Sequence, residues 1–398
     1  MKRCCFRLLL AWVILGHAPL YGQEKISLDK PSQVYTIPWD ADWVTAVTFV
    51  GDTRRLAAGN KLGQILIFDI PDSPSPPAPL PKGEGGMNSF PPPLRRLDGH
   101  TNMITALAAS PDGRWLFSAS YDHTIRIWDM QAPAKGKGVA ILKGEKAKKG
   151  KTPEKADFPV EIHEAHTVLT AHKEWIRTMS LSPDGKHLLS GDDAGVNILW
   201  DMPAGKEVRR WQVKGWLTAV ALSPDARHAV TCEYGPPYTE LLHGIHLWDA
   251  TSAKQKLDLG KTLKRGTGKN NVLAMWGAAF SRDGTLLALG QANEEGGFAK
   301  VFLINVADGK KLHEMNGHRD GVTAVAFHPD GLHLASTGRD TTVRIWRIAD
   351  GKHVADLGKG RGGQFQDWTH SIAFTKDGRW LAAADMAGQI QIWRFGKE

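Results

Sequence analysis

The chain repeats one sequence pattern, and its best-preserved copies end in Trp-Asp or a close variant. In one copy, Gly99-His100 is followed by the turn Ser110-Pro111-Asp112-Gly113 and then by an apolar segment that ends at Trp128-Asp129. The same order recurs from Gly317-His318 to Ile345-Trp346. A repeat of about 40–45 residues with Gly-His and Trp-Asp dipeptides is typical of a small four-stranded sheet that packs against copies of itself. We therefore expect one all-β domain built from such sheets.

Each copy contains a tight turn that joins two antiparallel strands. In Ser110–Gly113, Pro presets φ, Asp can bond the local backbone, and Gly tolerates a positive φ. Complete or partial copies stand at Val50–Thr53, Ser110–Gly113, Ser182–Gly185, Ser223–Ala226, Ser281–Gly284, His328–Gly331 and Thr375–Gly378. These seven turns predict seven sheets.

An apolar segment with period-2 alternation follows each turn, which is typical of a strand with one face against a neighbouring sheet. These predicted strands are 65–69, 125–128, 196–200, 245–248, 301–304, 343–346 and 390–393.

These motifs resemble the WD40-repeat β-propeller family, and the resemblance covers about Gln33 to Phe395. It implies an all-β fold, a seven-bladed β-propeller of four-stranded antiparallel blades. In that family a well-formed blade contains a buried set of His, Ser or Thr, Asp and Trp side chains joined by hydrogen bonds. Carried over by position, two sets are complete: His100, Ser118, Asp122 and Trp128 in the second blade, and His318, Ser336, Asp340 and Trp346 in the sixth.

The other blades depart from this set. The third has His172, Ser190 and Trp200, but Ala194 stands at the Asp position, and the remaining blades depart further. The residue types would also suit a catalytic triad. Buried polar groups need partners, however, and these groups satisfy one another, so we expect structural tetrads and no catalytic residues.

The seventh blade ends at Ile392–Phe395 with only three strands of its own. Segment Gln33–Ile37 precedes the first blade and has no other evident role, so we expect it to supply the fourth strand. This pairing would close the ring and protect an exposed edge.

Residues 1–22 have the pattern of a secretory signal peptide, with a basic start and an apolar run too short to span a membrane comfortably. We divide the chain into this signal, a linker over 23–32, and the propeller over 33–398, and we expect an exported protein: periplasmic, envelope-associated or secreted. An uncleaved N-terminal anchor is the alternative; the mature chain should otherwise have no transmembrane span. Cys232 alone would remain after cleavage, so no internal disulfide is expected.

The chain has a formal net charge of +8, and much of the excess is local. Residues 135–155 contain eight lysines and two glutamates. A solvated disordered loop is the favoured interpretation, and an arm for an anionic surface is the alternative. The absence of interleaved aromatic residues argues against single-stranded nucleic acid, and we expect no specific nucleic-acid partner.

Four insertions interrupt the repeats. Those at 71–93 and 131–165 follow the third strands of their blades and should emerge on one face. Those at 233–244 and 291–299 lengthen hairpins between second and third strands, on the opposite face, which is the commoner partner surface in the family. Loops on a rigid scaffold usually carry recognition.

Tryptophans recur just before the first strand of a blade, on the face with the lengthened hairpins. The four at this position are Trp43, Trp175, Trp216 and Trp368, and Trp276 is displaced from it by two residues. In similar propellers this position lies near the mouth of the central channel. Exposed aromatic residues are typical binding hot spots, so we expect these four to bind a partner. The alternative is that the rings pack between blades.

We therefore expect a non-catalytic scaffold that binds protein partners and has no cofactor. A carbohydrate or cell-wall binding module that uses the tryptophans is the first alternative, and a propeller hydrolase with a metal is the second. His163, His166 and His172 lie near Glu161 and Glu164, but one of these histidines belongs to a blade set, so we expect no metal site there.

Overall fold

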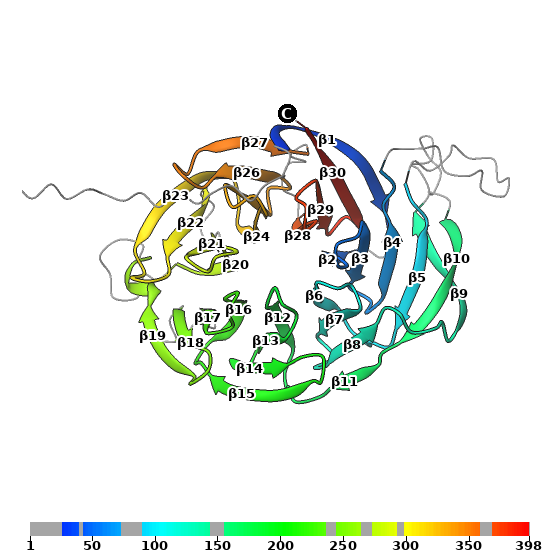
Figure 1. The fold of residues 1–398 in the computed structure, drawn as a ribbon, viewed down its shortest axis with the longest axis horizontal. Helices are drawn as coiled ribbons and strands as arrows, with labels where there is room; N and C mark the ends of the chain where they lie inside the picture. Colours follow the sequence, from blue (N-terminus) through cyan, green and yellow to red (C-terminus); the bar gives the residue numbers. More distant parts are fainter. Residues whose placement is uncertain are drawn as a thin grey trace, which may run out of the picture.

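The computed structural model describes residues 26–39, 43–72, 90–143, 155–235, 244–263, 273–292, 298–358 and 368–397. Seven sheets stand around a central axis, and each sheet has one inner strand and extends outward from it (Figure 1). The only helical element in these described ranges is a short 3-10 turn, Leu259–Lys261. The predicted fold, a seven-bladed β-propeller with four-stranded blades, is confirmed.

The blades follow one another along the chain, and each runs from its inner to its outer strand. Blade 1 is β2 (Val44–Phe49), β3 (Arg55–Asn60), β4 (Ile65–Asp69) and β5 (Pro93–Asp98). Blade 2 is β6 (Ile104–Ala109), β7 (Trp115–Ser120), β8 (Ile125–Asp129) and β11 (Thr167–Leu169). Blade 3 is β12 (Ile176–Leu181), β13 (His187–Asp192), β14 (Val196–Asp201) and β15 (Lys206–Gln212). Blade 4 is β16 (Trp216–Leu222), β17 (His228–Tyr234), β18 (Gly244–Asp249) and β19 (Lys254–Asp258).

The remaining blades keep this order. Blade 5 is β20 (Met275–Phe280), β21 (Leu286–Gln291), β22 (Ala299–Asn305) and β23 (Lys311–His318). Blade 6 is β24 (Val322–Phe327), β25 (His333–Gly338), β26 (Val343–Arg347) and β27 (His353–Leu357). Blade 7 is β28 (Thr369–Phe374), β29 (Trp380–Asp385), β30 (Gln389–Lys397) and β1 (Ile26–Pro38).

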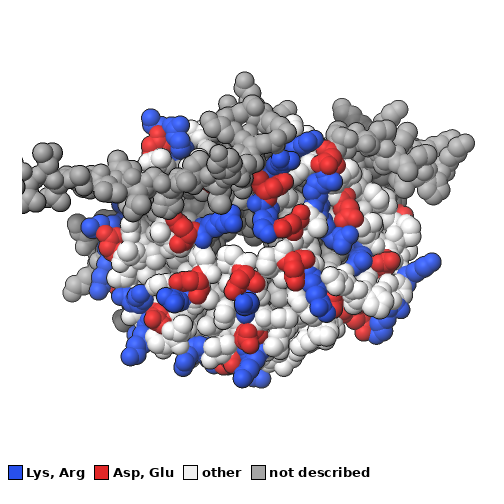
Figure 2. All heavy atoms as spheres, in the orientation of Figure 1, with Lys and Arg blue, Asp and Glu red and all other residues white. Residues whose placement is uncertain are grey.

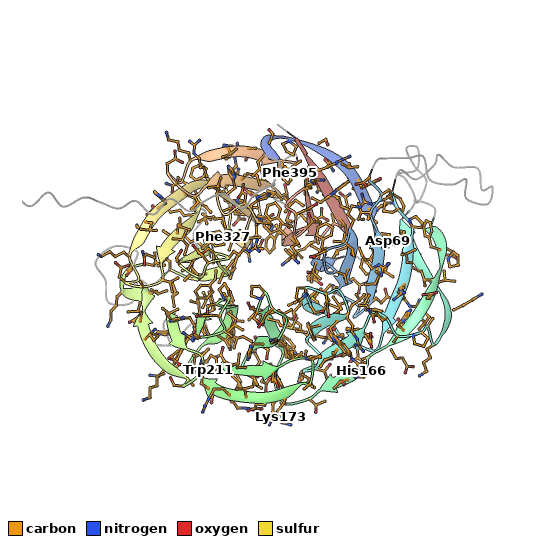
Figure 3. The ribbon with its side chains drawn as sticks, viewed as in Figure 1. Asp69, His166, Lys173, Trp211, Phe327 and Phe395 are labelled. Atoms are coloured by element: carbon orange, nitrogen blue, oxygen red, sulfur yellow. The ribbon has the colours of Figure 1, made fainter. Side chains whose placement is uncertain are left out.

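The core lies between adjacent blades, where apolar side chains from both sheets interdigitate (Figure 3). Leu116 and Trp128 of blade 2, for example, pack with Ile65 and Ile67 of blade 1, and all four are buried. Each blade therefore depends on its neighbours to cover its apolar faces, as expected for a closed array of repeats.

Threonine hydroxyls near the start of the inner strands also join neighbouring blades. Thr45, Thr105, Thr218 and Thr323 each donate a hydrogen bond to an inner-strand carbonyl of the next blade, over 2.5–2.8 Å. The equivalent position near the start of the inner strand is occupied by Arg177, Trp276 and His370 in blades 3, 5 and 7. Four blades therefore have a threonine that bonds the next blade at this position, and three blades have a different residue type.

The predicted closure of the ring is confirmed. Strand β1 pairs antiparallel with β30, with Gln33 opposite Trp393 and Ile37 opposite Ile390. The expected linker over 23–32 is wrong for residues 26–32, because β1 already begins at Ile26. Leu28 is buried in the core that contains Trp393, so this segment contributes apolar packing as well as strand pairing.

The expectation of a disordered Lys-rich loop over 135–155 is wrong for residues 136–143 and for Lys155, which lie in strands. Gly136–Lys143 (β9) and Lys155–Glu164 (β10) form an antiparallel hairpin, and β10 pairs parallel with β5, which extends blade 1 to six strands. Alternate residues, Ala140 and Leu142 on β9 and Phe158 and Val160 on β10, are buried against the junction of blades 7 and 1. These apolar side chains supply the burial that a solvated loop lacks.

No helix in the described residues is long and apolar enough to cross a membrane. The predicted signal peptide, the central lysines of the hairpin loop and most of the insertion at 71–93 lie outside the described residues.

Candidate partner-binding face

Blades 2 and 6 contain the tetrads that the sequence predicts as complete. In blade 2 the His100 imidazole donates from Nδ1 to Asp122 over 2.7 Å, Ser118 lies 2.7 Å from the other ring nitrogen, and the Trp128 indole donates to Ser118 over 2.9 Å. Burial lowers the pKa of His100 despite the opposing effect of Asp122, so the imidazole is neutral at neutral pH. Blade 6 repeats the arrangement with His318, Asp340, Ser336 and Trp346. The polar groups of each tetrad satisfy one another's hydrogen bonds in the interior. The serine and histidine side chains of these tetrads are therefore not available to solvent as nucleophile and base.

Blade 3 also has a complete tetrad, which the sequence comparison missed. The carboxylate comes from Asp192, whose Oδ2 lies 2.7 Å from His172 Nδ1, and not from the position of Ala194. Ser190 lies 2.7 Å from His172 Nε2 and accepts a hydrogen bond from the Trp200 indole. Asp192 Oδ1 also accepts the backbone N–H groups of the following turn.

Blade 4 uses a different polar network. Its Trp248 indole donates to Thr231 over 2.9 Å, and the imidazole of His246 pairs with Glu233 over 2.6 Å. Burial opposes protonation of His246, but the hydrogen bond to Glu233 and its charge outweigh burial and raise the pKa of this imidazole.

The four predicted tryptophans occupy equivalent positions at one end of the ring. Trp43, Trp175 and Trp368 accept, through their carbonyls, a backbone N–H from the residue just after the second strand of the same blade, and Trp216 pairs with Tyr234 in the same register. The hairpins between second and third strands leave from this end, because antiparallel neighbours alternate in direction. We call this end of the ring the tryptophan face, defined by Trp43, Trp175, Trp216 and Trp368.

Trp175 and Trp216 are the exposed members of this set, with 44% and 38% of their surfaces accessible. Each indole stacks on a tyrosine: Trp175 on Tyr121 of blade 2, with 4.8 Å between ring centroids and 13° between planes, and Trp216 on Tyr234, with 6.4 Å and 20°. Stacking on one side restrains a ring and leaves the rest of its surface available for contact. Trp43 and Trp368 are half-buried.

Cations accompany the tryptophans. Lys61 Nζ lies 4.2 Å from the centroid of Trp43, and the Arg177 guanidinium lies 5.6 Å from the ring of Tyr121. Arg339 contacts two indoles, with its guanidinium carbon 3.8 Å from the centroids of both Trp276 and Trp368. The structure thus brings the displaced Trp276 into contact with the same cation as Trp368, a juxtaposition that repeat spacing does not predict.

The histidines considered for a metal site serve separate roles. His172 belongs to the blade 3 tetrad, His166 packs on Trp115 toward the outer edge of the ring (Figure 3), and buried His163 lies 3.4 Å from Glu161. Among the described residues, no group of three or more His, Cys, Asp or Glu side chains is arranged to hold a metal ion.

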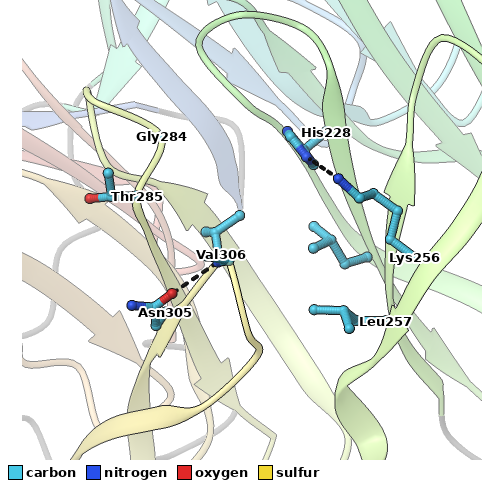
Figure 4. Close-up of a pocket in the computed structure, with 9 residues that line it drawn as sticks. His228, Lys256, Leu257, Gly284, Thr285, Asn305 and Val306 are labelled. Carbon is cyan, nitrogen blue, oxygen red and sulfur yellow. Dashed lines mark hydrogen bonds between the residues drawn. The ribbon is translucent and has the colours of Figure 1, made fainter.

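A pocket of about 510 Å³ lies between blades 4 and 5 (Figure 4). Its lining includes the Gly284 turn between the first and second strands of blade 5, at the end of the ring opposite the tryptophan face. Leu257 and Val306 provide apolar walls, and Lys256 Nζ lies 2.8 Å from His228 Nε2. Burial, together with the Lys256 charge, lowers the pKa of His228, so the neutral imidazole accepts a hydrogen bond from the ammonium group.

Acidic and basic side chains are interspersed on the face of the molecule seen in Figure 2, without a large patch of one sign. Proteins that bind nucleic acid through its phosphates instead concentrate Lys and Arg on one surface.

A closed ring of seven four-stranded blades with His–Ser–Asp–Trp tetrads defines a β-propeller of the WD-repeat class. The chain contains WD40 repeats: the family model described as "WD domain, G-beta repeat" matches residues 91–129, 164–201, 309–347 and 363–394.

Two relatives align with most of the chain. The small ribosomal subunit protein RACK1y of Oryza sativa subsp. japonica is 29% identical over 298 residues, which cover 75% of this chain and 79% of that protein. The nuclear distribution protein PAC1-2 of Uncinocarpus reesii is 24% identical over 266 residues, which cover 65% of this chain and 42% of that protein.

Proposed function

We propose that this chain is an exported, non-catalytic scaffold that binds a protein partner through its tryptophan face. The observation that carries the proposal is the pair Trp175 and Trp216, two exposed indoles at equivalent positions of adjacent blades, each restrained by a stacked tyrosine. Rigid aromatic anchors lose little conformational entropy when they bind, so they are efficient contact residues.

The relatives support an interaction role. The name of RACK1y places that protein in the small ribosomal subunit, which is a multi-component assembly. This seven-bladed chain aligns with 79% of RACK1y, which supports a role as a scaffold in an assembly.

Export is proposed on the basis of residues 1–22, whose basic start and short apolar run fit a signal peptide. The exposed Lys135 and Lys137 on the β9–β10 hairpin fit a weaker, salt-sensitive attachment to an anionic envelope surface. Fractionation of the native host, with N-terminal sequencing of the recovered protein, tests export directly: recovery of an uncleaved chain in the cytosol would contradict it.

Affinity capture from the native envelope fraction tests the binding proposal. The wild-type chain should retain a protein partner that the Trp175→Ala/Trp216→Ala double variant loses. Retention of glycan in place of protein would instead favour the carbohydrate-binding alternative, and equal capture by both chains would contradict the assignment of the face.

A further inference from the structure

Among the described residues, the half-buried Arg339 has no carboxylate in contact. It follows β25 in blade 6, where its backbone N–H donates to the Gly321 carbonyl over 2.9 Å. Its side chain lies over the indoles of Trp276 from blade 5 and Trp368 from blade 7. Within the described residues, its Nε is buried and has no hydrogen-bond partner. We call Arg339, Trp276 and Trp368 the arginine clamp.

The carboxylate of Asp320 does not form an ion pair with Arg339. Asp320 acts on Arg339 only through space, and its Oδ1 accepts the Gly321 N–H over 2.6 Å. Burial lowers the pKa of Arg339 from its ordinary value, although an arginine of this kind remains charged at neutral pH. The protein therefore holds a partly desolvated cation without a carboxylate in contact among the described side chains.

Arg177 provides an internal comparison on the same face. It also accompanies an aromatic ring, but its Nε and Nη2 both bond the carboxylate of Asp193, with Nη2 and Oδ2 at 3.1 Å. The chain thus supplies a bidentate acidic partner to Arg177 and none to Arg339 within its described part. Another molecule can supply the missing group.

The geometry limits the chemistry of that group. Two indole faces lie against the guanidinium, so strong hydrogen bonds are available only at its N–H edge. A planar carboxylate matches such an edge with two parallel N–H···O bonds. The indole rims offer apolar contact to the adjoining methylene groups, and a single cation matches a single negative charge better than it matches a phosphate dianion.

We propose that the arginine clamp binds a carboxylate of the partner, either an Asp or Glu side chain or a free C-terminus. This inference rests on the proposed function, because it names the group that a partner inserts beside Trp368 on the tryptophan face. The arginine clamp selects a partner that presents a carboxylate, and Trp175 and Trp216 supply general apolar contact on the same tryptophan face.

The test uses the full chain labelled with 5-fluorotryptophan, with the ¹⁹F resonances of Trp276 and Trp368 assigned from Trp→Phe variants. Four probes are titrated: the α-amide of N-acetylglutamate, which has a side-chain carboxylate, N-acetylalanine, which has a C-terminal one, the α-amide of N-acetylglutamine, and inorganic phosphate. At least one of the two carboxylate probes should shift both resonances saturably, and the glutamine probe should not. Whichever carboxylate binds more tightly identifies the source.

Arg339→Gln should weaken carboxylate binding about tenfold or more, and Arg339→Lys should weaken it less, because the lysine keeps the charge and loses the fork. Arg177→Gln is the matched control and should leave binding unchanged. The proposal is overturned by equal responses to the glutamate and glutamine probes, by a stronger response to phosphate, by no response to any probe, or by responses that persist in a folded Arg339→Gln chain. A different result would separate this proposal from the proposed function. If the arginine clamp binds carboxylate but the Trp175→Ala/Trp216→Ala variant still captures the partner, the proposed function is overturned and the clamp remains a carboxylate site.

Discussion

The indoles of Trp128 and Trp346 stabilise their blades in two ways, because each fills a large buried volume and donates the hydrogen bond that completes a tetrad. We expect Trp128→Ala or Trp346→Ala to lower the free energy of unfolding by about 3–5 kcal/mol. Urea denaturation followed by circular dichroism measures this loss. Unchanged stability in either variant would contradict the structural role of the tetrads.

His370 gives the fold a dependence on pH. Burial, reinforced by the charge of Arg339, lowers the pKa of this imidazole to about 4. A folded-state pKa below the unfolded value of about 6.5 means that the unfolded chain takes up the proton first, so stability is full above that pH and is lost as pH falls. We expect His370→Gln to reduce the stability lost between about pH 7 and pH 5 by about 1–2 kcal/mol. Parallel denaturation curves at the two pH values test this, and an unchanged difference would contradict it.

Asp192 shows why the family's motif spacing does not predict the tetrad of blade 3. Spacing from Ser190 and Trp200 assigns the acidic position to Ala194, yet the side chain that reaches His172 comes from Asp192. Residues two apart in a strand share a face, so Ser190 and Asp192 both point at the same histidine. Strand periodicity therefore favours Asp192 as the acidic member of the tetrad, whereas the family's usual spacing favours the position of Ala194.

Among the strands, β1 determines whether the ring is closed. It covers the outer edge of β30 from Ile26 to Pro38, and Leu28 is buried beside Trp393. Deletion of residues 23–38 should expose the backbone edge of blade 7 and promote aggregation. Light scattering and size-exclusion chromatography measure the outcome. A monomeric truncated chain as stable as the wild type would show that another strand closes the ring.

The β9–β10 hairpin should stabilise the junction of the first and last blades. Leu142 and Phe158 are buried in the same core as Trp39 and Trp380. We expect Leu142→Ala or Phe158→Ala to cost about 2–5 kcal/mol of stability, whereas Ile141→Ala, at an exposed position of the same strand, should cost little. Thermal unfolding of the three variants decides between a packed element and a solvated one, for which all three substitutions would be neutral.

Repeat spacing predicted the seven blades, the pairing of the N-terminal strand and the shared position of the four tryptophans. It did not predict the hairpin, because the lysines of 135–155 concealed the alternation of Ala140 and Leu142 with the exposed Val139 and Ile141. It also could not predict the arginine clamp. Arg339, Trp276 and Trp368 belong to three consecutive blades, 5 to 7, and only the packing of these blades beside one another brings the three side chains together.

In the molecule as a whole, the interior that stabilises the ring is separate from the proposed binding face. The tetrads and the core between blades hold the ring, and we propose that the tryptophan face recognises the partner. Substitutions at the two kinds of position should therefore have different effects. Tetrad variants should lose stability first, and variants of the tryptophan face should lose binding first.

Partner affinity of the Trp175→Ala and Trp216→Ala variants tests this separation most directly. Each substitution should weaken binding to the captured partner by about 2 kcal/mol or more while the unfolding temperature stays close to that of the wild type. Leu332→Ala, at an exposed apolar residue beside the Gly331 turn on the opposite face, is the control and should change neither quantity. If the tryptophan variants unfold before they lose binding, or if they bind as tightly as the control, the tryptophan face is not the binding surface.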